Sequence, residues 1–209
     1  MEKKLGCIKS KLTGTERKFS IPKGSLDIPE EYSLKEYCTP IQDQGRTNQC
    51  VCFSTISALD WRVNMKTGKK TFNGFKPEEI YAIRSDKTQD NGMTFKESLS
   101  YAKNHGVKMS DGKNYKIDDF ALVGSEIALK YALIENGICL FAVPVYDTNY
   151  TDFWKERGEI IGGHAMAIVG YNQFGYIFRN SWGDKWSDKG YGLLPYSDFK
   201  YVWEVWTLL

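Results

Sequence analysis

Cys50 has the position expected of a catalytic nucleophile, because it begins the strongest helical pattern in the chain. Apolar residues recur with the helical period at Cys52, Ile56, Leu59 and Val63. A thiol reacts as the thiolate, and the free N–H groups at the start of a helix favour that anion. Cys52 belongs to the apolar stripe and Cys50 does not, so Cys50 is predicted to be the reactive thiol and Cys52 a core residue.

A thiol nucleophile needs a base, and the chain offers two histidines, His105 and His164. His164 follows two glycines at the start of an apolar, strand-like run, and glycine lets other backbone approach closely. His105 precedes Gly106 at the predicted end of a helix, where a favourable interaction with the helix dipole explains it more simply. His164 is therefore the predicted base.

Asn180 and Gln44 complete a set of groups suited to acyl transfer. A catalytic imidazole needs a partner for its second nitrogen, and the amide oxygen of Asn180 can serve without adding charge. The indole of Trp182 could shield that hydrogen bond from water. Gln44 stands six residues before Cys50 and could join the Cys50 backbone N–H in an oxyanion hole. Such a donor lowers a reaction barrier by about 3–4 kcal/mol.

Taken alone, each of these residues also has a structural explanation. A cysteine in a helix is usually a core residue. A histidine at the start of a strand is often a hydrogen-bonded structural residue, and Asn180-Ser181-Trp182-Gly183 is consistent with a turn that carries one aromatic ring. The functional interpretation depends on all of them occurring together.

The elements that must position these groups are helices in the first part of the chain and strands in the second. The first helix is expected from Cys50 to about Met65, ending before Gly68. A capping box at Thr94-Phe95-Lys96-Glu97 predicts a second helix that runs to about Asn104.

A third helix is expected after Ser125, with apolar residues at Ile127, Tyr131 and Ile134 and an end at Asn136-Gly137. Short strand-like runs bounded by Gly, Asn and Asp occupy residues 138–146, 164–171, 176–178, 191–194 and 202–208. Helices followed by strands indicate an α+β protein in which two lobes face each other.

The composition fits a folded protein without an unusual charge. A chain of 209 residues can form one sizeable core or two small lobes, and 42% hydrophobic residues are enough to pack it. The 28 basic and 26 acidic residues are spread along the sequence and give a net charge of +2. Neither nucleic acid nor a membrane surface is therefore an expected partner. No apolar run follows the charged N-terminus, so no secretory signal peptide is expected.

The cysteines are Cys7, Cys38, Cys50, Cys52 and Cys139. Their odd number and irregular spacing argue against a disulfide framework and favour reduced thiols and a cytoplasmic location, although export by another route stays open. The Cys50-x-Cys52 spacing does not suit zinc, and two histidines are too few to compensate. Neither a metal nor another cofactor is expected.

Together these segments resemble the papain family of cysteine peptidases. The similar segments are residues 43–54 around the nucleophile, 163–171 around the histidine, and 180–183 with 186 and 190–192 around the asparagine. The six-residue step from Gln44 to Cys50 is part of that similarity. The resemblance covers about residues 27–209 and implies a papain-like α+β fold: a helical left lobe, a β-barrel-like right lobe and an active-site cleft between them.

The resemblance divides the chain into a peptidase domain and an extension. The helical lobe is expected at about residues 27–110 and the barrel lobe at about residues 111–209. Residues 1–26 form a lysine-rich extension, much shorter than the long helical propeptide of lysosomal relatives. It could lie across the cleft as a short inhibitory arm, or pack elsewhere as a structural strap.

The activity implied by the resemblance is that of a cysteine endopeptidase acting on peptides or proteins as a monomer. A Cys50 thiolate paired with the His164 imidazolium attacks a peptide carbonyl, while Gln44 and the Cys50 N–H stabilise the oxyanion. His164 protonates the leaving amine and then activates water to release the acyl-enzyme. Asn180 keeps the imidazole aligned.

Substrate contacts also follow from the resemblance. Gly92 and Met93 would pair with substrate backbone, and Gly163 would offer its carbonyl from the opposite wall. Ala165 would form the floor of an apolar pocket for the residue two before the cut. The chain departs from the family signature in the pair before the nucleophile, Asn48-Gln49, and this leaves the shape of the primed-side wall open.

Two alternatives keep these residues and change the activity. A Cys-His-Asn site also suits acyl transfer to an amine, or cleavage of a side-chain or isopeptide amide. A peptide-binding module without turnover is the more distant alternative, and the presence of Gln44, Cys50, His164 and Asn180 together argues against it.

Overall fold

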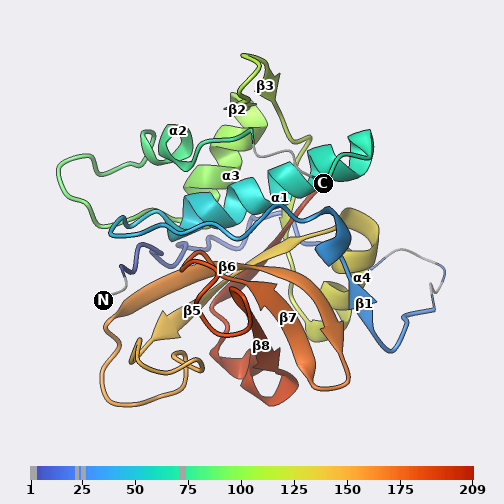
Figure 1. Cartoon of the computed structure of the whole chain (residues 1–209), viewed down its shortest axis with the longest axis vertical. Helices are drawn as coiled ribbons and strands as arrows, with labels where there is room; N and C mark the ends of the chain where they lie inside the picture. The colour runs from blue at the N-terminus through green and yellow to red at the C-terminus, as the bar shows by residue number, and fades with distance from the viewer. Residues whose placement is uncertain (1–3, 22–23, 25–26, 71–73) are drawn as a thin grey trace.

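Helix α1 (Cys50–Thr67) crosses the middle of the molecule and begins at the predicted nucleophile (Figure 1). The structure is a computed structural model that describes residues 4–21, 24, 27–70 and 74–209. Gly68 ends α1 in the left-handed conformation, with φ at 68°, as its position in the sequence predicts. The helix is two residues longer than expected, and Cys52, Ile56 and Leu59 are fully buried, so the predicted apolar stripe is confirmed.

The other predicted helices are confirmed at their capping residues. Helix α3 (Phe95–Asn104) has the complete capping box of Thr94 and Glu97, and α4 (Glu126–Asn136) is capped by the Ser125 hydroxyl. The prediction that Ile127 lies on the buried side of α4 is wrong. Its side chain is 49% exposed, because α4 packs through Ala128, Leu129 and Ala132 instead.

The strands from residue 120 onward form one large antiparallel sheet with the order β4-β9-β5-β6-β7-β8, and the two short strands within residues 107–115 pair separately. The strands from residue 120 onward are β4 (Phe120–Leu122), β5 (Cys139–Val145), β6 (Gly162–Asn172), β7 (Gly175–Arg179), β8 (Tyr191–Pro195) and β9 (Glu204–Leu208). The predicted strand-like runs from residue 138 onward are all confirmed, with shifts of one or two residues at their ends. Strand β5 is buried along its whole length, because it lies between β9 and β6.

Several short elements are not apparent from the sequence pattern. They are β1 (Tyr32–Ser33), the 3-10 helices η1 (Lys35–Tyr37) and η2 (Tyr196–Tyr201), α2 (Pro77–Tyr81), β2 (Val107–Lys108) and β3 (Asn114–Tyr115). Strand β1 pairs with β6, and β4 is only three residues long and pairs with β9. Such short strands depend on distant partners, so local patterns do not reveal them.

The helical layer packs on the sheet through α1, which lies against β6 and β5. Figure 1 shows α1, α2 and α3 on one side of the molecule and the sheet on the other, so the α+β architecture is confirmed. The half-buried guanidinium of Arg62 on α1 also donates to the backbone oxygens of Leu208 and Asn136, at 2.6 and 3.3 Å. These bonds fasten α1 to the ends of β9 and α4. The lobe boundary at about residue 110 stays a prediction.

Candidate active site

Cys50 lies where the helical layer meets the sheet, at the first residue of α1, and its side chain is fully buried. The first-turn N–H groups of a helix have no partner within the helix, so the site is electropositive. The backbone N–H groups of Ala165 on β6 and of Gly6 donate to the Cys50 sulfur. Three separate segments therefore meet at this thiol.

His164 and Asn180 are brought together by the pairing of β6 with β7. Asn180 follows directly on β7, and its Oδ1 lies 2.7 Å from Nε2 of His164. The same oxygen accepts the backbone N–H of Ser181 at 2.8 Å, which fixes the orientation of the amide. With Nε2 held by Asn180, Nδ1 is the ring nitrogen left for proton transfer.

An aromatic group encloses the His164–Asn180 bond. Trp182 stacks on the imidazole, with ring centroids 4.3 Å apart and planes inclined by 25°. Phe153 meets the imidazole edge-on at 5.7 Å and contacts Trp182 at 4.9 Å. Trp182 is 2% exposed and His164 is fully buried, so the hydrogen bond lies in a region of low dielectric constant.

Gln44 is held beside this group by the loop that follows β7. Its backbone N–H donates to the Ser181 carbonyl at 2.8 Å, and the Ser181 hydroxyl donates to Oε1 of its side chain at 2.6 Å. The amide nitrogen Nε2 donates to Thr47 O at 2.8 Å and to Lys4 O at 3.1 Å. Because Ser181 fixes Oε1, the amide must present its N–H₂ group to the position that the Lys4 carbonyl occupies. Ser181 is a positioning residue that the sequence pattern did not single out.

Residues 4–10, called the cleft segment below, run between α1 and the sheet across all of these groups (Figure 1). Gly6 O accepts from Met93 N at 3.0 Å, and Ile8 N donates to Met93 O at 3.0 Å. On the other side, Cys7 N donates to Gly163 O at 3.1 Å. The cleft segment thus forms backbone hydrogen bonds on both of its sides, with Met93 on one and with Gly163 on the other.

The backbone of the cleft segment lies so close to the neighbouring backbone that only glycine fits at the points of contact. A Cβ atom on Gly6 would lie 1.8 Å from Asn48 O, and one on Gly92 would lie 2.0 Å from Gly6 O. A Cβ atom on Gly163 would lie 2.3 Å from Cys7 O. These distances are far below any normal contact between a carbon and an oxygen atom, so a substitution at these glycines must displace backbone.

Burial dominates the electrostatics of the nucleophile in this arrangement. It raises the pKa of Cys50 to about 11, although the N–H groups of Ala165 and Gly6 favour the thiolate and oppose the shift. Burial likewise raises the pKa of the Cys52 thiol well above its usual value. Covering of Cys50 thus favours the neutral thiol over the thiolate.

The structure brings together most of the residues named from the sequence. Gly92, Met93 and Gly163, expected to contact substrate, all contact the cleft segment, and Ala165 is fully buried beside the Cys50 sulfur. Cys52 lies in the core, with its sulfur 3.3 Å from the Met93 sulfur. His105 lies apart from this group, at the end of α3, where it stacks on Tyr101 at 5.2 Å.

All five cysteines are free thiols, while the cytoplasmic location stays a prediction. Among the described residues, no cluster of three His, Cys, Asp or Glu side chains could hold a metal ion. Of the helices in the described part of the chain, none combines the length and hydrophobicity needed to cross a bilayer.

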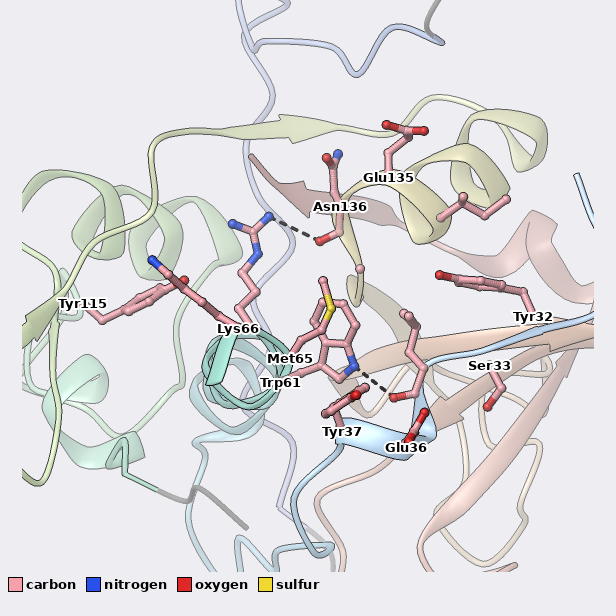
Figure 2. A pocket seen from close by; sticks show the side chains of 14 residues that line it. Tyr32, Ser33, Glu36, Tyr37, Trp61, Met65, Lys66, Tyr115, Glu135 and Asn136 are labelled. Atoms are coloured by element: carbon pink, nitrogen blue, oxygen red, sulfur yellow. Dashed lines mark hydrogen bonds between the residues drawn. The ribbon is translucent and has the colours of Figure 1, made fainter. Parts of the chain in front are cut away.

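A cavity of about 450 Å³ lies elsewhere, between the last turns of α1 and α4 (Figure 2). Trp61, Met65 and Tyr37 form its apolar wall. The indole N–H of Trp61 donates to the backbone oxygen of Leu34 at 3.0 Å, as the dashed line in Figure 2 shows. The described residues that line it include no cysteine and no histidine, so this cavity offers no counterpart to the Cys50–His164 group.

The sequence of this chain matches the model of a known protein family. A family model described as "Papain family cysteine protease" matches residues 73–198, which is more than half of the chain. That range includes His164 and Asn180 but not Cys50 or Gln44.

Curated relatives are similar at the level of sequence. Cathepsin K of Mus musculus is 28% identical over 195 residues, which cover 78% of this chain and 58% of the relative. Papain of Carica papaya is 25% identical over 220 residues, covering 91% of this chain and 62% of papain. The chain therefore spans about three fifths of the length of the curated relatives that it matches.

Solved structures share the fold. Xylellain, a cysteine protease from Xylella fastidiosa, superposes with a TM-score of 0.81 at 19% identity, covering 100% of this chain and 98% of that one. A Carica candamarcensis cysteine protease in complex with E-64 gives a TM-score of 0.70 at 20% identity, with coverages of 87% and 98%. The predicted papain-like α+β fold is confirmed by these matches.

Proposed function

The chain belongs to the papain family of cysteine proteases, and we propose on that premise that it is an endopeptidase held closed by its own cleft segment. Cys50 is the nucleophile, His164 the base, and Asn180 the group that orients the imidazole. The observation that carries the proposal is the 2.7 Å bond from His164 to Asn180 beside the buried start of α1. Peptides and proteins are the substrates.

The reaction follows from the positions of these groups once the cleft is open. Water reaches Cys50, the cost of burying its charge falls, and the proton passes to His164. The sulfur attacks the carbonyl carbon of a peptide bond, and Nε2 of Gln44 with the Cys50 N–H stabilises the oxyanion. His164 donates a proton to the leaving amine and then takes one from the water that hydrolyses the thioester.

The cleft segment occupies two groups that the chemistry would use. Lys4 O accepts from Nε2 of Gln44 at 3.1 Å, and the N–H of Gly6 donates to the Cys50 sulfur. The segment therefore blocks the groups required for chemistry, and we assign it the role of the short inhibitory arm.

Labelling with an epoxysuccinyl thiol inhibitor tests the proposal. Intact mass would be measured for the wild type, Cys50→Ala and Cys52→Ala, each also combined with Gly6→Ala to open the cleft. A single adduct that disappears only with Cys50→Ala supports the assignment, and Cys52→Ala is the matched control two residues away. An adduct that persists in Cys50→Ala, or no adduct in any folded form, would refute it.

Product analysis separates peptide hydrolysis from the related reactions. The opened chain is expected to release free carboxylate and amine products from a peptide, with no transfer to an added amine. Transfer products or cleavage restricted to isopeptide bonds would favour an acyl transferase or an isopeptidase on the same groups.

A further inference from the structure

Arg179 is a buried cation that the proposed chemistry does not use. It is the last residue of β7, directly before Asn180, and it is 3% exposed. Its Nη2 donates to Pro40 O at 3.0 Å and to Thr39 Oγ1 at 3.4 Å. Its Nε and Nη1 are buried, and neither has a hydrogen-bond partner among the residues that the structure describes. A guanidinium removed from water needs acceptors for its N–H groups and a counter-charge.

A small cavity lies beside this guanidinium. Its volume of about 10 Å³ is room for one water molecule or one ion of similar size. Helix α1 contributes Phe53, Ser54 and Ser57 to its lining, and the end of β7 contributes Arg179 and Asn180. The described lining residues include no carboxylate. Nδ2 of Asn180 is a further buried donor with no partner in the described part of the chain, so the cavity is rich in unused donors.

The ionisable groups around Arg179 do not supply the counter-charge in mild acid. Within the described residues, no carboxylate forms an ion pair with it. Burial raises the pKa of Asp60 on α1 to about 7, although the charge of Arg179 opposes the shift. Burial also raises the pKa values of Cys38 and Tyr191, again against the charge of Arg179. Lys35 lies over the Tyr191 ring at 4.3 Å and adds a second positive charge.

We propose that this cavity binds a chloride ion, which neutralises Arg179 and holds the side-chain amide of Asn180. A chloride ion is only slightly larger than a water molecule and accepts N–H groups from several directions, whereas water brings no charge. Nε and Nη1 of Arg179 and Nδ2 of Asn180 are its donors. Oδ1 of the same amide lies 2.7 Å from Nε2 of His164, so the ion and the imidazole would hold the amide from its two ends. The effect on turnover rests on the proposed peptidase function, but the binding of the ion does not.

Thermal unfolding of the full chain in two sodium salts tests the binding. Tm would be measured at pH 5.5 in sodium chloride and in sodium gluconate at equal ionic strength, because gluconate is too large for the cavity. A tenfold excess of chloride over its Kd should raise Tm by about 3–6 °C in a chain of this size. The difference between the salts should shrink above the pKa of Asp60, because the ionised carboxylate then supplies the charge.

Two variants locate the ion. Arg179→Gln should abolish the difference in Tm, and Arg46→Gln is the matched control, because Arg46 is exposed and its change removes the same charge outside the cavity. Ser54→Asp serves if Arg179→Gln does not fold. It adds a carboxylate to the lining, so its Tm should be the same in both salts. Equal Tm values for the wild type would mean that water alone fills the cavity, and a chloride effect that persists in both variants would place the ion elsewhere. Either result would overturn the inference.

Kinetics of the chain opened by Gly6→Ala test the effect on Asn180. With a fluorogenic dipeptide amide, kcat should be lower in gluconate than in chloride by up to about tenfold at unchanged KM, as expected from loss of one hydrogen bond that orients the catalytic groups. Equal kcat values in the two salts would overturn the role of the ion in holding the amide. Cleavage in neither salt, together with no inhibitor adduct on Cys50 and an intact chloride effect on Tm, would overturn the proposed function and support the ion site.

Discussion

The cleft segment and the residues that follow it are held to the protein in different ways. Residues 11–19, called the trailing segment below, are mostly exposed, whereas Gly6, Cys7 and Ser10 are buried. The cleft segment is bound chiefly through its backbone, against the candidate site residues and glycines. Side-chain ion pairs bind much of the trailing segment: Glu16 to Lys96 at 2.7 Å, and Arg17 to Asp119 at 2.8 Å.

The two segments should therefore have different roles: the cleft segment covers Cys50, and the trailing segment attaches the N-terminal chain to the rest of the protein. The backbone hydrogen bonds of the cleft segment depend on close packing, so a single added atom that clashes should break several of them together. An ion pair that solvent reaches is weak by itself and responds to salt, and solvent reaches Arg17 (62% exposed) more than Glu16 (6% exposed) or its partner Lys96 (33% exposed). The trailing segment does have a backbone component, since Phe19 N donates to Leu122 O at 2.9 Å and Leu122 N to Arg17 O at 2.8 Å. The cleft segment should therefore control activity, and the trailing segment should only adjust how long the cleft segment stays.

The largest effect is expected from Gly6→Ala. The new Cβ atom would lie 1.8 Å from Asn48 O, so the cleft segment cannot keep its position. An overpacking cost of about 1–3 kcal/mol corresponds to about 5- to 150-fold more of the open form. The rate of Cys50 labelling by an epoxysuccinyl inhibitor should rise by that factor.

Gly14→Ala is the matched control for that measurement. Gly14 lies in the trailing segment with φ at +83°, and a Cβ atom there would meet nothing within 4 Å. Its substitution introduces backbone strain without a clash, so labelling should change little. Equal labelling rates for Gly6→Ala and wild type would mean that the cleft segment does not control access to Cys50.

A second effect concerns the pH dependence of Cys50 alkylation. Burial raises the Cys50 pKa to about 11 in the closed form, so that form keeps its proton until the solution is strongly alkaline. The open form, with water at the sulfur, has a lower pKa. Raising the pH between these two values therefore favours opening, because the open form releases the proton first.

Iodoacetamide labelling between pH 5 and pH 10 measures this shift. The rate for the wild type should still be rising at the upper end, while the rate for Gly6→Ala should level off at lower pH. Identical profiles for the two chains would show that covering by the segment does not set the pKa of Cys50.

The smallest effect is expected from Glu16→Gln in the trailing segment. The hydrogen bond from Lys96 holds the pKa of Glu16 well below its usual value, so the carboxylate stays charged in mild acid. Its contribution is complete above the ordinary glutamate pKa and is lost only as the pH falls through the lowered value. Removing the charge should speed Cys50 labelling by less than about fivefold, as for other partly exposed ion pairs.

Salt supplies the control for this comparison. Added sodium chloride should reproduce part of the Glu16→Gln effect in the wild type and have little further effect in the variant. An increase from Glu16→Gln as large as that from Gly6→Ala would show that the trailing segment, rather than the cleft segment, limits opening.

The helices and strands that carry the candidate site groups could be predicted from sequence because their signals are local, while the roles of those groups stay a prediction. The capping box of Thr94, the helix start at Cys50 and the glycines before His164 each act within a few residues. The outward position of Ile127 could not be predicted, because the neighbours of α4 decide which of its apolar residues are buried. The short strands β1 and β4 likewise exist only through distant partners.

The contacts of the cleft segment could not be predicted from sequence either. They join backbone groups of residues 4–10 to residues far along the chain, and a backbone hydrogen bond leaves no mark on residue type. Gly6 was the available signal, as a glycine in a lysine-rich extension. Its importance becomes visible only when its close approach to Asn48 and Gly92 is known.

The guanidinium of Arg62 suggests how the two layers behave when the cleft empties. It joins the helix that begins with Cys50 to the ends of β9 and α4, near the end of the helix opposite the proposed nucleophile. Because the helical layer is fixed to the sheet in this way, we expect the two layers to keep their separation after the cleft segment has left. Access to Cys50 should then depend on the position of the cleft segment and not on a movement of the layers.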